Sequence, residues 1–134
     1  MSRENVEVVS GMLETFEREG THAALEFAAP EFELTMPSIY PGPNRAFHGL
    51  AAAREAMEDW IDSFEDFRAA TEELIDAGDK VIAVVQESGR MRGSATRIDA
   101  PFTAVFAFDE QGRVARVDWF TDRAEALEAV GLSE

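Results

Sequence analysis

Helical and strand-like hydrophobic patterns occupy separate halves of this sequence, and that separation constrains the fold more than any other feature. In the first half, apolar residues recur every three or four positions, as they do on one face of an α-helix. The two series are Val6, Val9, Leu13 and Phe16, then Ala53, Met57, Trp60, Ile61 and Phe64. After residue 66 the pattern changes to strands separated by turns. Helices grouped before an antiparallel sheet predict an α+β domain.

Turn and capping residues divide the first half further. Gly20 ends the first helix, and Thr21 caps a short second helix. The alternation of apolar and polar residues over 32–36 predicts a half-buried strand. Residues 37–48 are rich in proline and predict a loop, either a functional segment or a rigid spacer. The third helix is expected to begin after Gly49.

Turn residues in the second half separate four predicted strands. These strands are expected near 67–76, at 81–88, along a long stretch that ends at Phe108, and at 113–121. A basic hairpin tip over 88–94 joins the second and third of them. Asp122 opens a terminal helix and Gly131 ends it. Because no repeat or linker divides the chain, residues 1–134 are expected to form a single domain.

Charge and hydropathy make several partners and locations improbable. The formal net charge is −15, which would repel nucleic acid and an anionic membrane surface. The sequence has no apolar run of 18 residues, and its N-terminus does not resemble a signal peptide. We therefore expect a cytoplasmic protein that binds neither nucleic acid nor membrane.

Cysteine and histidine content limits the available chemistry. The chain has no cysteine, which removes disulfides and thiolate nucleophiles. Its two histidines, His22 and His48, lie far apart and lack metal-binding spacing. We expect neither a metal site nor a cofactor.

Four stretches of the chain match a known family in order and spacing. They are residues 4–9 (Glu-Asn-Val-Glu-Val-Val), the Gly20 turn with the Ala-Ala-Leu helix that follows it, the Phe47-His48-Gly49 triplet, and residues 112–132, which include Phe-Thr-Asp-Arg-Ala-Glu-Ala-Leu. Over essentially its whole length the chain resembles SnoaL-like members of the nuclear transport factor 2-like superfamily. The resemblance implies a cone-shaped, curved antiparallel sheet wrapped around N-terminal helices, with one internal pocket. Because the superfamily includes polyketide cyclases, ketosteroid isomerases, epoxide hydrolases, dehydratases and non-enzymatic binding proteins, the fold does not fix the function.

The catalytic residues of two of these enzyme groups do not carry over. The general base of ketosteroid isomerases aligns with Met36, and their two oxyanion donors align with Leu13 and Ala104. The last-strand aspartate of limonene-epoxide-hydrolase-like proteins aligns with Trp119, although a gap of one residue would place Asp118 there instead. The side chains at these positions lack the carboxyl and hydroxyl groups that transfer protons and stabilise an enolate.

The phase of each strand decides which side chains enter the pocket. If Trp119 points inward, Val117 and Thr121 do so too, while Arg116 and Asp118 point outward. On the strand over 81–88, the residues expected to face inward are Ile82, Val84, Gln86 and Ser88. The predicted pocket residues are Met36, Tyr40, Met57, Trp60, Gln86, Ser88, Ala104, Phe106, Val117, Trp119 and Thr121. An apolar lining with a few polar groups is typical of small-molecule sites.

Two functions follow from such a pocket. The first is an isomerase- or cyclase-type enzyme that acts on a hydrophobic carbonyl compound without the usual catalytic carboxylates. The second is a non-catalytic protein that binds a small hydrophobic ligand. His48 is the candidate general acid–base, because the pKa of a histidine, about 6.5, suits that task. Packing or capping of the third helix is the alternative role for this residue.

The outer face of the predicted sheet suggests an assembly. Phe120 and Val114 would lie there around Arg116 and Asp118. An exposed apolar patch of this kind is typical of an interface between subunits. We therefore predict a two-fold homodimer through the convex face of the sheet.

Overall fold

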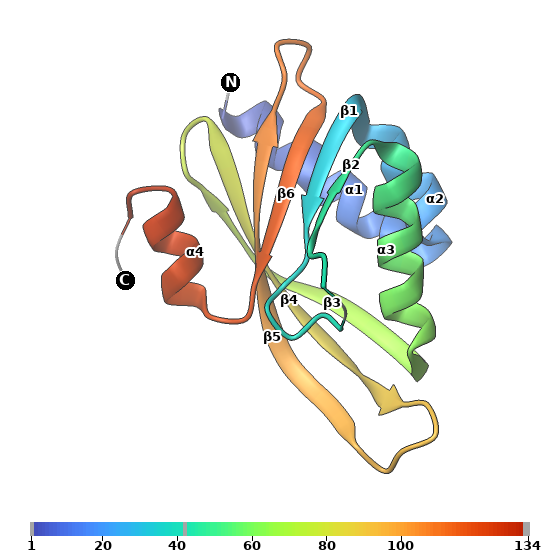
Figure 1. Cartoon of the computed structure of the whole chain (residues 1–134). Coiled ribbons are helices and arrows are strands. Elements are labelled where there is room, and N and C mark those ends of the chain that lie inside the picture. Colours follow the sequence, from blue (N-terminus) through green and yellow to red (C-terminus); the bar gives the residue numbers. More distant parts are fainter. Residues whose placement is uncertain (1, 42, 133–134) are drawn as a thin grey trace.

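The computed structural model describes residues 2–41 and 43–132, which contain helices at both ends and six strands (Figure 1). In chain order the elements are α1 (Ser2–Glu19), α2 (Thr21–Ala24), the short 3-10 helix η1 (Leu25–Phe27), β1 (Ala28–Thr35), β2 (Ala46–His48), α3 (Leu50–Asp62), β3 (Phe64–Asp76), β4 (Lys80–Met91), β5 (Arg97–Phe108), β6 (Val114–Phe120) and α4 (Arg123–Ala129). This order confirms the α+β class.

The described strands form one open sheet in the order β2-β1-β6-β5-β4-β3. Neighbouring strands are antiparallel except β1 and β6, which run parallel with Leu34 opposite Val117. The sheet is therefore mixed, which corrects the expectation of a fully antiparallel sheet. β1 and β6 are far apart in the sequence, so no hairpin fixes their relative direction and local patterns do not reveal it.

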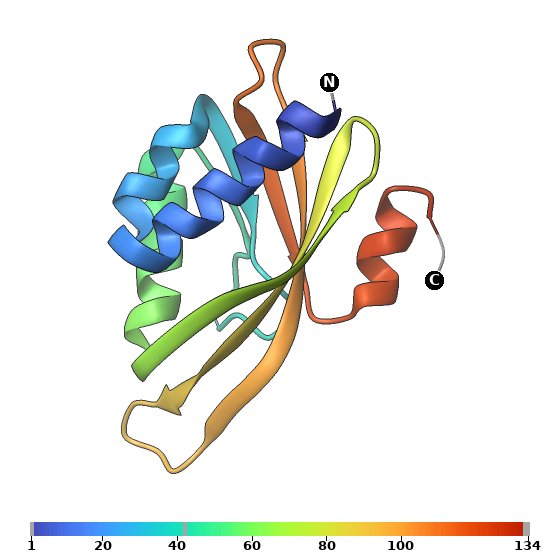
Figure 2. The same ribbon diagram turned by 180° about the vertical axis from the view of Figure 1, so that it is seen from behind.

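Helices cover the two faces of the sheet unequally. α1, α2 and α3 gather on one face, which we call the inner face, and α4 lies against the other, the outer face (Figure 1 and Figure 2). The main core fills the inner side and includes Val9, Phe32 and Phe106. A second cluster fills the space beneath α4, and its buried members are Ile82, Val105, Ala126 and Leu127. Part of the sheet is consequently buried on both faces.

The segment over 37–48 is not entirely a loop. Its last three residues form β2, which pairs with β1 so that His48 lies opposite Glu33. The backbone N–H of Met36 also donates to the carbonyl of Arg45, which draws the two ends of the segment together. A strand this short is too brief to show an alternating pattern, so periodicity does not predict it.

The hairpin between β4 and β5 begins later than expected, because β4 continues to Met91. β3 begins correspondingly early, at Phe64, which the helical series had placed in α3. Phe64 packs so closely on β4 that a Cβ added to Gly89 would lie 3.0 Å from its ring. Glycine at this position therefore lets the two strands approach rather than marking a turn.

Candidate ligand site

The main cavity lies between the inner face of the sheet and the first three helices. Its volume is about 60 Å³ and its surface is apolar throughout. The lining residues are Met12, Leu13, Phe16, Glu17, Thr21, Ala24, Leu25, Phe32, Leu34, Met57, Ala69, Val85, Phe106, Val117 and Trp119. Amphipathic α1 and α3 supply one wall, since each turns its apolar side chains toward the sheet.

The predicted pocket residues divide between this cavity and a smaller one. Met57, Phe106, Val117 and Trp119 line the main cavity. Met36 and Trp60 instead line the small cavity, which has a volume of about 10 Å³. Its other lining residues are Pro37, Met57, Glu87, Phe102 and Trp119. The two cavities therefore share the side chains of Met57 and Trp119.

The predicted phase of β4 is wrong. Val81, Ala83 and Val85 belong to the main core on the inner side, whereas Ile82 packs beneath α4 on the outer side. Gln86 consequently faces outward, where its amide nitrogen lies 2.7 Å from Asp99 Oδ1. By the same alternation Ser88, opposite Asp99 in the sheet, also faces outward.

Three other predicted pocket residues lie outside both cavities. Thr121 lines a groove on the outer face, together with Glu73 and Arg123. Ala104 is fully buried within the core of the sheet. Tyr40 packs against Trp60 with 6.3 Å between ring centroids, so it supports the wall of the small cavity from behind.

The corrected phase of β4 brings a carboxyl group inward, at Glu87. This side chain is only 5% exposed. Its Oε1 accepts a hydrogen bond of 2.9 Å from Trp60 Nε1. Burial raises the pKa of Glu87 to about 7, and the hydrogen bond from Trp60 opposes that rise. Sequence reasoning missed Glu87 because it assigned the alternating residues of β4 to the opposite faces.

An open surface groove lies beside the main cavity. It is lined by Phe16, Glu17, Gly20, Ile61, Phe67, Arg68, Ala69 and Ala70. Phe16, Glu17 and Ala69 also line the main cavity, so the groove and the cavity adjoin. The carboxylate of Glu17 accepts a hydrogen bond of 3.1 Å from the Thr71 hydroxyl and thereby ties α1 to β3 beside this groove.

The comparisons with known proteins agree with this architecture. The model of the SnoaL-like domain matches residues 9–117. The chain belongs to the SnoaL-like domain family. Among curated proteins, none matches the sequence.

Solved structures resemble this SnoaL-like domain over nearly its full length. An NTF2-like protein of unknown function from Burkholderia pseudomallei is 21% identical, with a TM-score of 0.75 and coverage of 96% of this chain and 98% of that one. A putative SnoaL-like polyketide cyclase from Jannaschia is 21% identical, with a TM-score of 0.73 and coverage of 98% and 94%. TerC, co-crystallized with polyporic acid, is 21% identical, with a TM-score of 0.73 and coverage of 95% and 98%. At these identities the likeness shows the fold alone.

The positions aligned with isomerase catalytic groups hold hydrocarbon side chains in this SnoaL-like domain. Leu13 lines the main cavity, Met36 lines the small one, and Ala104 lies within the sheet. On β6, Trp119 faces the cavities, whereas Asp118 lies on the outer face and accepts a 2.9 Å hydrogen bond from Arg116 Nε. Glu87 is therefore the carboxyl group beside the small cavity, at a position that the resemblance did not indicate.

His48 does not lie at the mouth of the cavity. Its side chain is 77% exposed, and its Nδ1 lies 2.9 Å from Glu33 Oε1. Glu33 also lies 3.9 Å from Arg116, which places this ionic cluster on the outer face. The structure thus separates the candidate general acid–base from both cavities.

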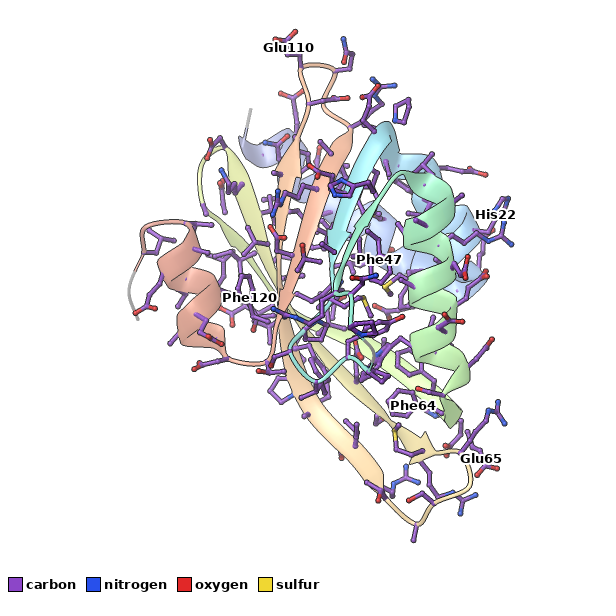
Figure 3. The ribbon with its side chains drawn as sticks, viewed as in Figure 1. His22, Phe47, Phe64, Glu65, Glu110 and Phe120 are labelled. Atoms are coloured by element: carbon purple, nitrogen blue, oxygen red, sulfur yellow. The ribbon has the colours of Figure 1, made fainter. Side chains whose placement is uncertain are left out.

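The outer face also differs from the patch expected for a dimer. Val114 is fully buried in the main core, and Phe120 lies on the α4 side, packed against the cluster beneath that helix (Figure 3). A bulge in the pairing of β5 with β6 shifts Val114 out of the expected phase. Charged side chains of Glu33, Arg116 and Asp118 remain on this part of the face. The homodimer stays a prediction, for which the particle mass in solution is the test.

Metal binding and membrane insertion have simple structural requirements. Within residues 2–41 and 43–132, no group of three or more His, Asp or Glu side chains is placed to hold a metal ion. Over the same residues, no helix is long and apolar enough to cross a membrane.

Proposed function

We propose that this SnoaL-like domain binds a small hydrophobic molecule in the main cavity. The observation that carries the proposal is the wholly apolar surface of a cavity between the helices and the sheet. Water finds few hydrogen-bond partners at an apolar surface, whereas an apolar ligand that leaves water gains the hydrophobic free energy of transfer. The co-crystallization of TerC, a neighbour in fold, with polyporic acid supports a ligand-binding role.

The cavity volume limits the size of the ligand. At about 60 Å³ it is smaller than the pockets of drug-sized ligands, which span about 300–1,000 Å³. Met12 and Met57 line it, and unbranched methionine side chains adapt readily to a guest. We therefore expect compact hydrocarbons, of which indane is a convenient probe, to bind better than steroids.

Substitution of Ala69 by leucine is expected to block the site. Residue 69 lines both the surface groove and the main cavity, so the larger side chain fills the space that a ligand needs. The affinity for indane should fall at least about tenfold, which corresponds to about 1.4 kcal/mol, in a calorimetric titration. Ala51→Leu on the exposed face of α3 is the matched control. Equal affinities of the two variants would contradict the proposed site.

A second candidate function is an isomerase- or cyclase-type enzyme that acts on a carbonyl compound. The observation that favours it is Glu87, whose pKa of about 7 suits a general acid–base at neutral pH. Proton transfer beside a carbonyl also needs a donor for the enolate oxygen. Leu13, Met36 and Ala104 supply hydrocarbon at the aligned positions, so binding remains the main proposal.

The two functions differ in what they predict for a β,γ-unsaturated ketone. We expect the protein not to convert cyclohex-3-enone into the conjugated ketone faster than buffer does, because Glu87 cannot act at once as the base and as the donor to the enolate oxygen. Ultraviolet absorbance of the conjugated product measures the rate. Turnover that is lost in Glu87→Gln would establish the enzyme instead.

A further inference from the structure

The small cavity holds a carboxyl oxygen that lacks a protein partner. Glu87 Oε1 accepts the hydrogen bond of Trp60, and Oε2 forms no hydrogen bond with any residue that the structure describes. The surrounding walls are mostly apolar and include Met36, Phe102 and Trp119. Oε2 is not fully buried, since among the described residues the fully buried side-chain atom without a partner is Thr21 Oγ1. An accessible polar atom of a buried side chain is satisfied by water or by a ligand.

We propose that Glu87 is the polar anchor of the ligand site and selects an apolar molecule that carries one uncharged hydrogen-bond acceptor, such as a ketone oxygen. The inference rests on the proposed function, because it takes the hydrocarbon part of the ligand to occupy the main cavity. Glu87 donates the hydrogen bond from its protonated carboxyl group, with Oε2 as the donor atom.

The arrangement of the two cavities suits a ligand of this kind. They share Met57 and Trp119, and Ala69 of the main cavity lies directly opposite Glu87 in the pairing of β3 with β4. The proposal requires Met57 to change its rotamer so that the two spaces join, which an unbranched methionine side chain permits. The small cavity, at about 10 Å³, has room for little more than one oxygen atom. It therefore fits the acceptor group and excludes the rest of the molecule.

The surroundings of Glu87 favour its neutral form. Its partners across the sheet are Ala69 on β3 and Ala100 on β5, and neither carries a charge. Trp60 of α3 donates a hydrogen bond but has no charge. Burial in this setting raises the pKa of Glu87 to about 7, so the protonated form persists to near-neutral pH.

The nearest titratable and charged groups lie behind these neighbours. Tyr40 packs on Trp60 from the loop after β1, and its pKa is raised by burial and then by Asp59 and Glu55 of α3. On β5, Asp99 faces outward and accepts from Gln86. On β3, Arg68 lies opposite the outward-facing Ser88. No cation in the described part of the chain is therefore placed to hold Glu87 ionised.

Indane and 1-indanone form a matched pair that tests this anchor, since they differ in one carbonyl oxygen. Calorimetric titrations of the wild type at pH 5.5 and 8.5 measure both affinities. At pH 5.5 we expect 1-indanone to bind up to about tenfold more tightly than indane, the range of one net hydrogen bond. At pH 8.5 the preference should disappear, because ionised Glu87 no longer donates.

Two substitutions of Glu87 separate its charge from its hydrogen bonding. In Glu87→Gln the amide oxygen can accept from Trp60 while the amide nitrogen donates, so the preference for 1-indanone should persist at both pH values. In Glu87→Met the preference should vanish at both, while indane still binds. Glu110→Gln, in the exposed β5–β6 turn (Figure 3), is the control and should keep the pH dependence of the wild type.

The possible results distinguish the two proposals. If neither compound binds at either pH, the proposed function itself is wrong. If indane and 1-indanone bind equally at pH 5.5, the cavity site stands and the anchor is overturned. If 1-aminoindane, a cation, binds more tightly than both at pH 8.5 and loses that advantage in Glu87→Gln, the site recognises amines, and the assignment of an uncharged acceptor is overturned.

Discussion

Replacing Glu87 by glutamine is expected to stabilise the protein at alkaline pH, by an amount that shrinks as the pH falls. The pKa of Glu87 is raised from its ordinary 4.5 to about 7 in the folded protein. Between these values the folded protein keeps a proton that the unfolded chain has lost, so stability falls as the pH rises. The penalty is absent below pH 4.5 and fully present above pH 7. A pKa shift of this size lowers the free energy of unfolding by about 3 kcal/mol. Glutamine avoids this penalty because its side chain does not ionise.

Urea unfolding of the wild type and Glu87→Gln at pH 5.5 and 8.5 measures this effect. The lower pH lies above the ordinary pKa range of exposed carboxyl groups, which therefore contribute little to the difference. Between pH 5.5 and the folded pKa of about 7, the wild type should lose about 2 kcal/mol of stability relative to Glu87→Gln. Glu110→Gln in the exposed turn should show no such trend. A pH-independent difference between wild type and Glu87→Gln would show that Glu87 titrates normally.

The sequence predicts the elements of this fold better than it predicts their faces. Helical periodicity identified α1 and α3, and alternation on β5 and β6 correctly turned Phe106, Val117 and Trp119 inward. On β4, however, residues 81–85 are all apolar. The inner core covers one side of this strand and α4 covers the other. A strand buried on both faces loses its alternating pattern, so its phase has no local signal.

The error on β4 explains part of the errors at the candidate site. A phase displaced by one residue exchanges every side chain between the faces, which put Gln86 and Ser88 in the pocket and removed Glu87.

The apolar patch expected on the outer face of the sheet was wrong because the position of the last helix was not foreseen. Asp122 does cap the terminal helix, with its side chain accepting from the N–H of Ala124, but capping residues do not say where a helix docks. α4 packs on the outer face near Phe120.

Replacing Trp60 by phenylalanine is expected to destabilise the protein more at pH 8.5 than at pH 5.5. The indole N–H lies 2.9 Å from Glu87 and stabilises its ionised form, so its loss should raise the pKa of Glu87 further. A hydrogen bond to a charged group contributes about 1.5–3 kcal/mol, against about 1 kcal/mol for a neutral one. The packing lost with the indole ring is the same at both pH values. The excess at pH 8.5 should therefore be about 0.5–2 kcal/mol.

A double-mutant cycle between Trp60→Phe and Glu87→Gln isolates this hydrogen bond from packing. In the Glu87→Gln background, the cost of Trp60→Phe should not depend on pH, because no group in the pair ionises. Trp119→Phe is the matched control, since Trp119 lines the same small cavity but does not donate to Glu87. A pH dependence as large in Trp119→Phe as in Trp60→Phe would mean that the dependence comes from solvation of the cavity. A dependence confined to Trp60→Phe, and removed by Glu87→Gln, would assign it to the indole–carboxyl hydrogen bond.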